Sequence, residues 1–117
     1  MATHNAFGKW GEEIACQFLT QKGYSITQKN YRHRKGEIDI IAQKAEEIVF
    51  VEVRTRSNEQ FVETEESISR YKEELLIETA SHYLESKNID LDARFDVIIV
   101  LGKSNPEIRH YEGAIEP

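Results

Sequence analysis

Two acidic residues interrupt consecutive apolar runs near the middle of the chain, Asp39 in "GEIDIIA" and Glu52 in "VFVEVRTRS". Both runs have the composition of β-strands, and the charged segment "QKAEE" between them is typical of a turn. In the simplest antiparallel register the facing pairs are Ile41 with Phe50, Asp39 with Glu52, and Glu37 with Arg54. Alternate side chains share a face of a sheet, and directly opposed Cβ atoms lie about 5 Å apart. The spacing therefore predicts two carboxylates side by side.

Carboxylates this close repel each other, and burying them without partners is costly. Protonation of one acid, a nearby Arg or Lys, or a bound cation would relieve the repulsion. A hard divalent ion suits the last arrangement, because Mg²⁺ is held by one or two carboxylates together with waters and substrate phosphate. The alternative is that the acids face solvent on the wet side of an antiparallel hairpin.

The length and composition limit the class of protein. A chain of 117 residues, 39% hydrophobic and 31% charged, predicts one globular domain. No apolar run reaches the roughly 18 residues that span a bilayer. The N-terminal residues lack the basic start and apolar stretch of a signal peptide. The single cysteine, Cys16, cannot form an internal disulfide, so we expect a cytoplasmic protein without membrane contacts.

The charge is distributed unevenly along the chain. The net charge of −6 argues against a nucleic-acid partner, but residues 1–57 carry +2 and residues 58–117 carry −8. A local positive surface is enough for a nucleic-acid enzyme, because phosphate attraction is screened within about 10 Å. The densest basic run is "KNYRHRKG", residues 29–36. Charge alone favours a solvated loop for this run.

The remaining elements follow from periodicity. Apolar residues have helical spacing over 7–23, with Glu12 on the flank of the apolar stripe. Residues 24–32 alternate like an edge strand, and a long helix is predicted over 65–87. The run "RFDVIIVLG" at 94–102 is typical of a central strand, and 108–115 is an edge strand or a tail. The order α-β-β-β-α-β-β predicts one α/β domain over residues 1–117, with a mixed sheet and helices packed on it.

Lys72 falls within the apolar side of the second predicted helix. That side is formed by Ile68, Tyr71, Leu75, Leu76, Thr79, Ala80 and Tyr83. A lysine there either extends its amine to solvent or reaches an acidic partner, and the spacing leaves both alternatives open. Trp10 and Tyr31 are candidates for stacking on bases, with core packing favoured for Trp10. The four histidines have no ligand-like spacing.

Five sequence blocks carry a family resemblance. The blocks "GEIDIIA" and "VFVEVRTRS" resemble the metal-binding core of the PD-(D/E)XK nuclease superfamily, an acid followed by (D/E)-x-K on a neighbouring strand. With "GKWGEEIACQFLTQKGYSITQKNYR", "SRYKEELLIETASHYL" and "RFDVIIV" in order, almost the whole chain is similar to the YraN-like family of endonuclease-related proteins. The resemblance implies a restriction-endonuclease-like fold and metal-assisted hydrolysis of a phosphodiester.

Carried over by position, the resemblance makes Asp39 and Glu52 the ligands of Mg²⁺ or Mn²⁺ and Glu12 a third acid. The lysine of the signature is replaced by Arg54, which stays charged at any accessible pH and can neutralise phosphate but cannot act as a base. The resemblance also favours Lys72 pointing at the acidic pair. The implied catalytic residues are Asp39, Glu52, Arg54, Lys72 and Glu12. The implied nucleic-acid-binding residues are Lys29, Arg32, Arg34, Lys35 and Arg56.

The favoured interpretation is a small nuclease-like domain that binds or cleaves nucleic acid, with DNA preferred over RNA. One alternative is a non-catalytic nucleic-acid-binding or adaptor module of the same fold, whose acids form a structural ion-pair cluster with Arg54 and Lys72. Another is a homodimer like the Holliday-junction resolvases, in which the acidic C-terminal half would face away from DNA.

Overall fold

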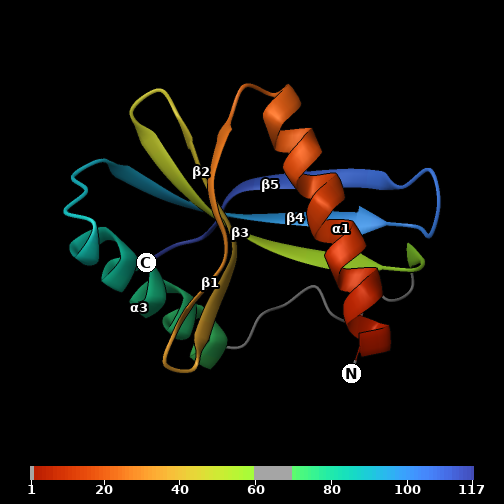
Figure 1. Ribbon diagram of the computed structural model, residues 1–117, viewed down its shortest axis with the longest axis horizontal. Coiled ribbons are helices and arrows are strands. Elements are labelled where there is room, and N and C mark those ends of the chain that lie inside the picture. The colour runs from red at the N-terminus through yellow and green to blue at the C-terminus, as the bar shows by residue number, and fades with distance from the viewer. Residues whose placement is uncertain (1, 60–69) are drawn as a thin grey trace.

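The computed structural model describes residues 2–59 and 70–117, which form an α/β domain with one mixed sheet and a helix on each face (Figure 1). The elements are α1 (Ala2–Gln21), β1 (Ser25–His33), β2 (Gly36–Lys44), β3 (Glu47–Arg56), α3 (Arg70–Ser86), β4 (Asp92–Leu101) and β5 (Glu107–Ile115). The predicted α/β class and mixed sheet are confirmed.

The five strands lie side by side in the order β1-β2-β3-β4-β5. β3 and β4 are parallel, and the other neighbours are antiparallel. β4 is buried from Phe95 to Val100, as a continuous apolar run predicts for a strand covered on both faces. The predicted edge strand β1 lies at one edge, and the last segment is the other edge strand, β5, not a tail.

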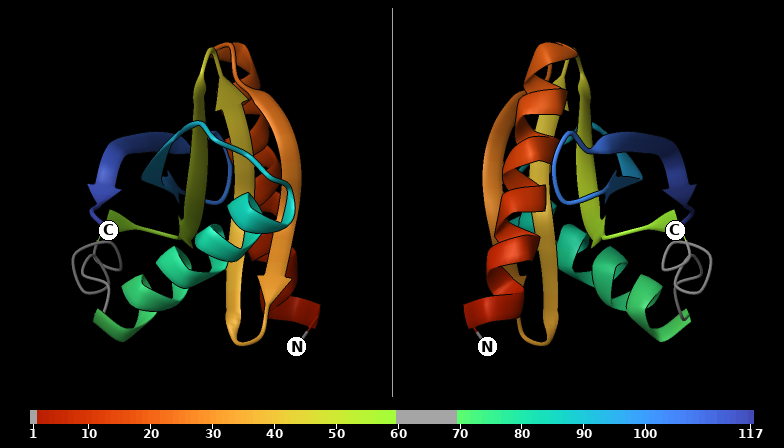
Figure 2. Two further views of the ribbon diagram at one scale, coloured as in Figure 1. Left: turned by 90° about the vertical axis from the view of Figure 1, so that its left-hand side faces the viewer. Right: turned by 90° about the vertical axis from the view of Figure 1, so that its right-hand side faces the viewer.

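The two helices bury separate apolar clusters against opposite faces of the sheet (Figure 2). The cluster under α1 contains Ala15, Leu19, Tyr24, Ile40, Ala42, Val49, Val51, Ile98 and Val100. The cluster under α3 contains Ile38, Ile41, Ile48, Phe50, Leu76, Ala80, Tyr83, Phe95, Val97, Ile99 and Ile115. The three central strands, β2, β3 and β4, thus supply side chains to both cores, which fixes their register.

Both helices differ in detail from the prediction. α1 begins at Ala2, five residues before the predicted start, because the polar first turns carry no apolar stripe that periodicity can detect. The predicted beginning of the second helix at 65, and Ile68 with it, lies outside the described residues. Tyr71 was predicted on the apolar side but is 62% exposed. The buried side of α3 begins only at Leu76, so the first turn of this helix does not face the sheet.

β2 and β3 pair along only part of their length. The ladder runs from Lys44 with Glu47 to Ile40 with Val51, and Ile41 faces Phe50 as predicted. The predicted pairs Asp39 with Glu52 and Glu37 with Arg54 are wrong as ladder pairs, since the ladder ends one residue before them. Beyond this point β2 stays with β1, β3 stays with β4, and the two strands diverge (Figure 2).

Candidate functional site

Asp39 lies at the point where β2 and β3 separate. Its Oδ2 accepts a hydrogen bond of 2.8 Å from the backbone N–H of Val53. This N–H belongs to the part of β3 that no longer pairs with β2, and a buried backbone donor needs an acceptor. The side chain of Asp39 supplies that acceptor. An acid in an apolar strand therefore has a structural reason here, because it caps the end of the β2–β3 ladder.

The surroundings of Asp39 disfavour its charged form. Burial raises the pKa of the Asp39 carboxyl from 3.8 to about 7, and the hydrogen bond from Val53 only partly opposes the shift. The negative charges of Glu12, Glu52 and Glu37 raise this pKa further. A cation bound beside Asp39 would reverse this balance, since an opposite charge stabilises the carboxylate.

Glu52 is buried with half of its carboxylate unsatisfied. The residue is 8% exposed, and its Oε2 lies 3.4 Å from both Arg54 Nε and Lys72 Nζ. Its Oε1 is buried and has no hydrogen-bond partner among the described residues. A buried acceptor without a partner typically costs about 1–3 kcal/mol, and more when it is charged. Such an atom needs an explanation, and a ligand that binds it is one.

A cavity of about 560 Å³ brings the two acids together. It is lined by Lys35, Gly36, Glu37, Asp39, Glu52, Val53, Lys72, Leu75 and Leu76. The cavity therefore occupies the space where the strands part and is closed on one side by α3. Carboxylates, amines and leucine side chains meet in it, so it offers oxygen ligands to a cation and positive charge to an anion.

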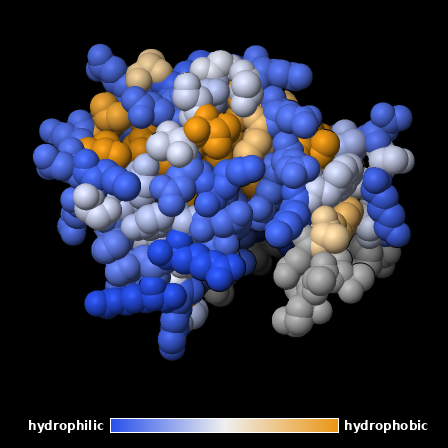
Figure 3. All heavy atoms as spheres, in the orientation of Figure 1, coloured by the Kyte–Doolittle hydropathy of each residue, from blue (hydrophilic) through white to orange (hydrophobic). Residues whose placement is uncertain are grey.

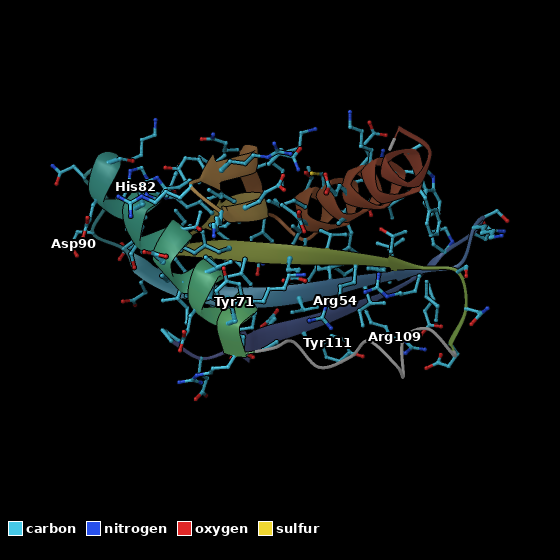
Figure 4. All side chains as sticks on the ribbon, turned by 90° about the horizontal axis from the view of Figure 1, so that it is seen from below. Arg54, Tyr71, His82, Asp90, Arg109 and Tyr111 are labelled. Carbon is cyan, nitrogen blue, oxygen red and sulfur yellow. The ribbon has the colours of Figure 1, made fainter. Side chains whose placement is uncertain are left out.

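Lys72 and Arg54 have different positions relative to this cavity. The Lys72 side chain is 60% exposed, yet its amine reaches Glu52, so it faces both the acids and solvent. Arg54 is labelled in Figure 4. It is 7% exposed and is not among the residues lining the cavity. The guanidinium of Arg54 lies against the buried Glu52, and its contact with phosphate stays a prediction. Arg54 holds Glu52 in place.

Glu12 belongs to a neighbouring hollow. Asn30 Nδ2 donates to Glu12 Oε1 over 3.1 Å and to Glu37 Oε2 over 3.3 Å. A second cavity of about 400 Å³ is lined by Gly8, Lys9, Glu12, Asn30, Arg32 and Glu37. Glu37 lines both cavities, so Glu12 lies beside the Asp39–Glu52 pair without lining its cavity.

Sequence reasoning missed the roles of Asn30 and Glu37. Asn30 adopts a left-handed backbone conformation, with φ of 53°, and Asn is both depleted in strands and tolerant of this conformation. An Asn in the middle of a predicted strand was the available signal. Glu37 was considered only as a partner for Arg54, and the structure pairs it with Arg32 instead.

Two glycines allow the elements around the site to approach closely. A Cβ on Gly36 would collide with the Thr79 hydroxyl and lie 3.1 Å from the Leu75 carbonyl oxygen. A Cβ on Gly11 would collide with the side chain of Thr55. Gly36 thus lets the β1–β2 hairpin touch α3, and Gly11 lets α1 touch β3, which brings Glu12 near the acidic pair.

The predicted nucleic-acid-binding residues are spread around these cavities. Lys35 lines the first cavity and Arg32 the second. Arg34 is exposed in the turn between β1 and β2, and Lys29 is exposed on β1. Arg56 ends β3, four residues beyond Glu52, or about 13 Å along a strand. The structure therefore gathers Lys35, Arg32 and Arg34 at the hairpin end and leaves Arg56 apart.

No preformed cluster of three metal ligands is present in the two described segments of the chain. Two carboxylates nevertheless suit Mg²⁺, which keeps several waters and completes its shell with substrate phosphate. The unpartnered Glu52 Oε1 and the Asp39 carboxyl fit that donor set. The residues fit a cation bound together with a substrate better than a permanent structural ion.

Comparison with known proteins identifies the family. The model of a family described as "Uncharacterised protein family UPF0102" matches residues 11–100. The chain belongs to the UPF0102 family. This confirms the family-level resemblance drawn from the five sequence blocks. The matched segment contains Glu12, Asp39, Glu52 and Lys72, so all four lie within the UPF0102 part of the chain.

Several UPF0102 proteins are similar to the chain over nearly its whole length. The UPF0102 protein of Flavobacterium psychrophilum is 43% identical over 115 residues, 97% of each chain. That of Phocaeicola vulgatus is 41% identical over 118 residues, 100% of this chain and 98% of its own. The Nitrosomonas europaea protein is 39% identical over 109 residues, 93% of this chain and 92% of its own. Among the described residues, no helix is long and apolar enough to cross a membrane.

Proposed function

We propose that this UPF0102 protein is a metal-dependent nuclease of the PD-(D/E)XK type, with a restriction-endonuclease-like fold, that hydrolyses phosphodiesters in nucleic acid in the cytoplasm. The observation that carries the proposal is the buried, unpartnered Glu52 Oε1 in the same cavity as Asp39. Asp39 lies on β2, and Glu52 begins the E-x-R motif on β3. The separation of these strands exposes both acids to one cavity, where their carboxylates can supply oxygen ligands to a cation that assists hydrolysis of a phosphodiester.

Each residue of the cavity has a role in this proposal. Asp39 and Glu52 hold Mg²⁺ or Mn²⁺, which when bound activates water and stabilises charge on the phosphate. The Val53 N–H orients Asp39, and Arg54 orients Glu52. Lys72, with its amine at the open side of the cavity, contacts the phosphate or the attacking water. Arg54 cannot take the proton from that water, because it remains charged.

The positive charge needed for nucleic acid lies on one side of the cavity. Lys35, Arg34 and Arg32 come from the β1–β2 hairpin, where that end of the molecule is covered by hydrophilic side chains (Figure 3). This local concentration matters more than the net charge of −6, because distant acids are screened at physiological salt.

A nuclease panel tests the proposal. Labelled single-stranded, duplex, flap and four-way-junction DNA, and RNA, are incubated with wild type and Glu52→Gln in Mg²⁺, Mn²⁺ or EDTA. We expect cleavage of at least one substrate by wild type with a divalent cation, and a loss of about 10²–10³ in rate in Glu52→Gln. Glu46→Gln, in the exposed β2–β3 turn, is the matched control and should cleave normally.

The same panel separates the alternatives. Binding without cleavage by wild type in every cation would contradict the nuclease and support a nucleic-acid-binding adaptor. For that alternative, the ion pairs of Glu52 with Arg54 and Lys72 would be purely structural. Cleavage confined to the four-way junction, together with a dimer in sedimentation equilibrium, would support the resolvase-like homodimer. Cleavage that persists in EDTA would contradict the metal requirement.

A further inference from the structure

Three rings form a stack where the β1–β2 hairpin meets α3. His33 and His82 lie face to face, with ring centroids 3.5 Å apart and planes inclined by 11°. His82 also stacks on Tyr31 at 6.3 Å and shares a hydrogen bond of 2.7 Å with the Tyr31 hydroxyl. Figure 4 shows His82 on the side of α3 that faces the hairpin. The order of the rings is therefore Tyr31, His82, His33.

The inner end of this stack is anchored in the core. Tyr31 packs edge-to-face on the buried Tyr83, with centroids 5.0 Å apart, and Tyr83 belongs to the apolar cluster under α3. The Tyr31 hydroxyl fixes the His82 ring. Because both inner rings are held, the outer ring has a rigid support.

The outer end of the stack carries His33. This residue is half-buried, and within residues 2–59 and 70–117 its ring stacks on no second ring. Desolvation lowers the pKa of His33, and the neighbouring His82 and Arg34 lower it further, which favours the neutral form of the His33 ring. Arg34 and Lys35 follow directly in the turn and are exposed. Glu78, one turn before His82 on α3, is an acidic neighbour.

The stack borders the cavity that contains the acids. His33 pairs with Gly36 across the two-residue turn, which places their Cα atoms about 5 Å apart. Gly36 and Lys35 line the cavity with Asp39 and Glu52. A planar group resting on His33 would therefore lie next to the cavity, on the side lined by Lys35 and Gly36.

From this juxtaposition we infer that His33, supported by His82, is a stacking platform for an unpaired nucleobase of the nucleic acid that the cavity acts on, with Arg34 and Lys35 on the adjoining phosphates. Bases stack on aromatic side chains whatever their identity, because every base has a π-face. A base inside a duplex has no free face to offer. The substrate class is thus a single strand, or the unpaired part of a flap or junction. This inference rests on the proposed function for the identity of the ligand.

Binding measurements in EDTA test the platform without cleavage. Fluorescence anisotropy compares dT15, rU15 and a 15-base-pair duplex on wild type, His33→Leu and His33→Phe. Leucine keeps apolar bulk against His82 but offers no ring, whereas phenylalanine keeps the ring. We expect His33→Leu to lose about fivefold or more in affinity for the unpaired oligonucleotides, with little change for the duplex. His33→Phe should bind like wild type. Tyr111→Ala removes an exposed aromatic on the far edge strand β5 and should bind normally.

Several outcomes would overturn the platform: no binding of either unpaired oligonucleotide by wild type, equal losses for duplex and unpaired strands, or equal losses in His33→Phe and His33→Leu. A merely structural role of His33 predicts a lower melting temperature with unchanged selectivity. Equal effects on dT15 and rU15 support a base-stacking platform that accepts both, whereas a loss for one assigns the platform to that nucleic acid. If wild type binds unpaired strands but cleaves no substrate, the proposed nuclease activity is contradicted and the platform is not. If wild type cleaves nucleic acid but His33→Leu keeps the wild-type preference for unpaired strands over duplex, the platform is contradicted and the nuclease activity is not.

Discussion

Asp39→Asn should stabilise the metal-free protein, and the size of the effect should depend on pH. The folded pKa of Asp39 is about 7 and the unfolded value is 3.8, so between these values the folded protein keeps a proton that the unfolded chain has released. The stability of the wild type should therefore fall as pH rises from about 4 to 7 and then level off. At 1.36 kcal/mol per pH unit, a gap of roughly three units amounts to about 4 kcal/mol.

This figure is an upper bound, because the pKa of Asp39 is coupled to the negative charges of Glu12, Glu52 and Glu37. Asparagine removes the charge and keeps an oxygen to accept the Val53 N–H, so the variant isolates the electrostatic cost. Against a typical total stability of about 5–15 kcal/mol, a gain of even half the bound is large.

Urea unfolding followed by far-ultraviolet circular dichroism measures the effect, in EDTA buffers from pH 4 to 8.5. The free energy of unfolding of Asp39→Asn minus that of wild type should be near zero at pH 4 and should reach a few kcal/mol by pH 8. Asp90→Asn changes an exposed acid (Figure 4) and should show no such rise. A difference that is constant across this range, or a wild type more stable than the variant at pH 8, would refute the electrostatic account.

Metal addition extends the same experiment. Mn²⁺ at one hundred times its dissociation constant should stabilise wild type at pH 8 by about 2.7 kcal/mol. Asp39→Asn should gain much less, because it has lost a ligand charge. Equal stabilisation of both proteins would place the cation elsewhere.

Three further predictions concern the elements around the site. Lys72→Ala should lower the cleavage rate in Mn²⁺ about 10²–10³-fold. Arg54→Lys should change this rate much less, because of these two residues only Lys72 lines the cavity. A larger loss in Arg54→Lys than in Lys72→Ala would contradict the role proposed for Lys72. Gly36→Ala should lower the free energy of unfolding by about 1–3 kcal/mol, since its methyl group would overlap a side chain of α3, whereas Gly8→Ala, with nothing within 4 Å, should not. Asp96→Asn should cost about 3 kcal/mol at pH 7, and this loss should shrink as pH falls from 3.8 toward the folded pKa of about 2.

Local periodicity was enough to predict much of the sheet. Alternation on each side of a charged turn predicted the Ile41–Phe50 register, because a slip of one residue would turn every side chain to the wrong core. The unbroken apolar run of "RFDVIIVLG" predicted a strand covered on both faces. The hairpin register depends on residues close together in sequence, and the central strand is recognised by its burial. The residue types indicate both properties directly.

The split between β2 and β3 could not be predicted in the same way. The ladder ends beyond Ile40 and Val51 because β3 follows β4 and β2 follows β1. The residue types near these positions do not specify which of the distant strands each one stays with. The same limit applies to Arg54, because its burial beside Glu52 depends on how the whole sheet packs. For Lys72 the spacing left two alternatives, an amine in solvent or beside an acid, and the resemblance favoured the contact with Glu52 that the structure shows.

The buried acids of this protein fall into two kinds, and the difference between them is the strongest argument for a ligand at the strand split. Asp96 is fully buried. Burial alone would raise its pKa, but hydrogen bonds from His110 at 2.7 Å, from Arg94 at 2.9 Å to each oxygen, and from the Gly113 N–H at 3.0 Å hold it at about 2.

Asp96 lies on β4, the strand next to β3, and both of its carboxylate oxygens have hydrogen-bond partners. The fold can therefore provide a buried carboxylate with a full set of partners. Glu52 is buried almost as deeply, yet one of its oxygens has no hydrogen-bond partner in the part of the chain that the structure describes, and its neighbour Asp39 has a pKa of about 7. A purely structural ion cluster would be expected to resemble Asp96, since a buried acceptor without a hydrogen-bond partner costs stability. The Glu52 oxygen that lacks a partner among the described residues, in a cavity shared with Asp39 and Lys72, therefore supports the proposal that a cation and a phosphate bind here.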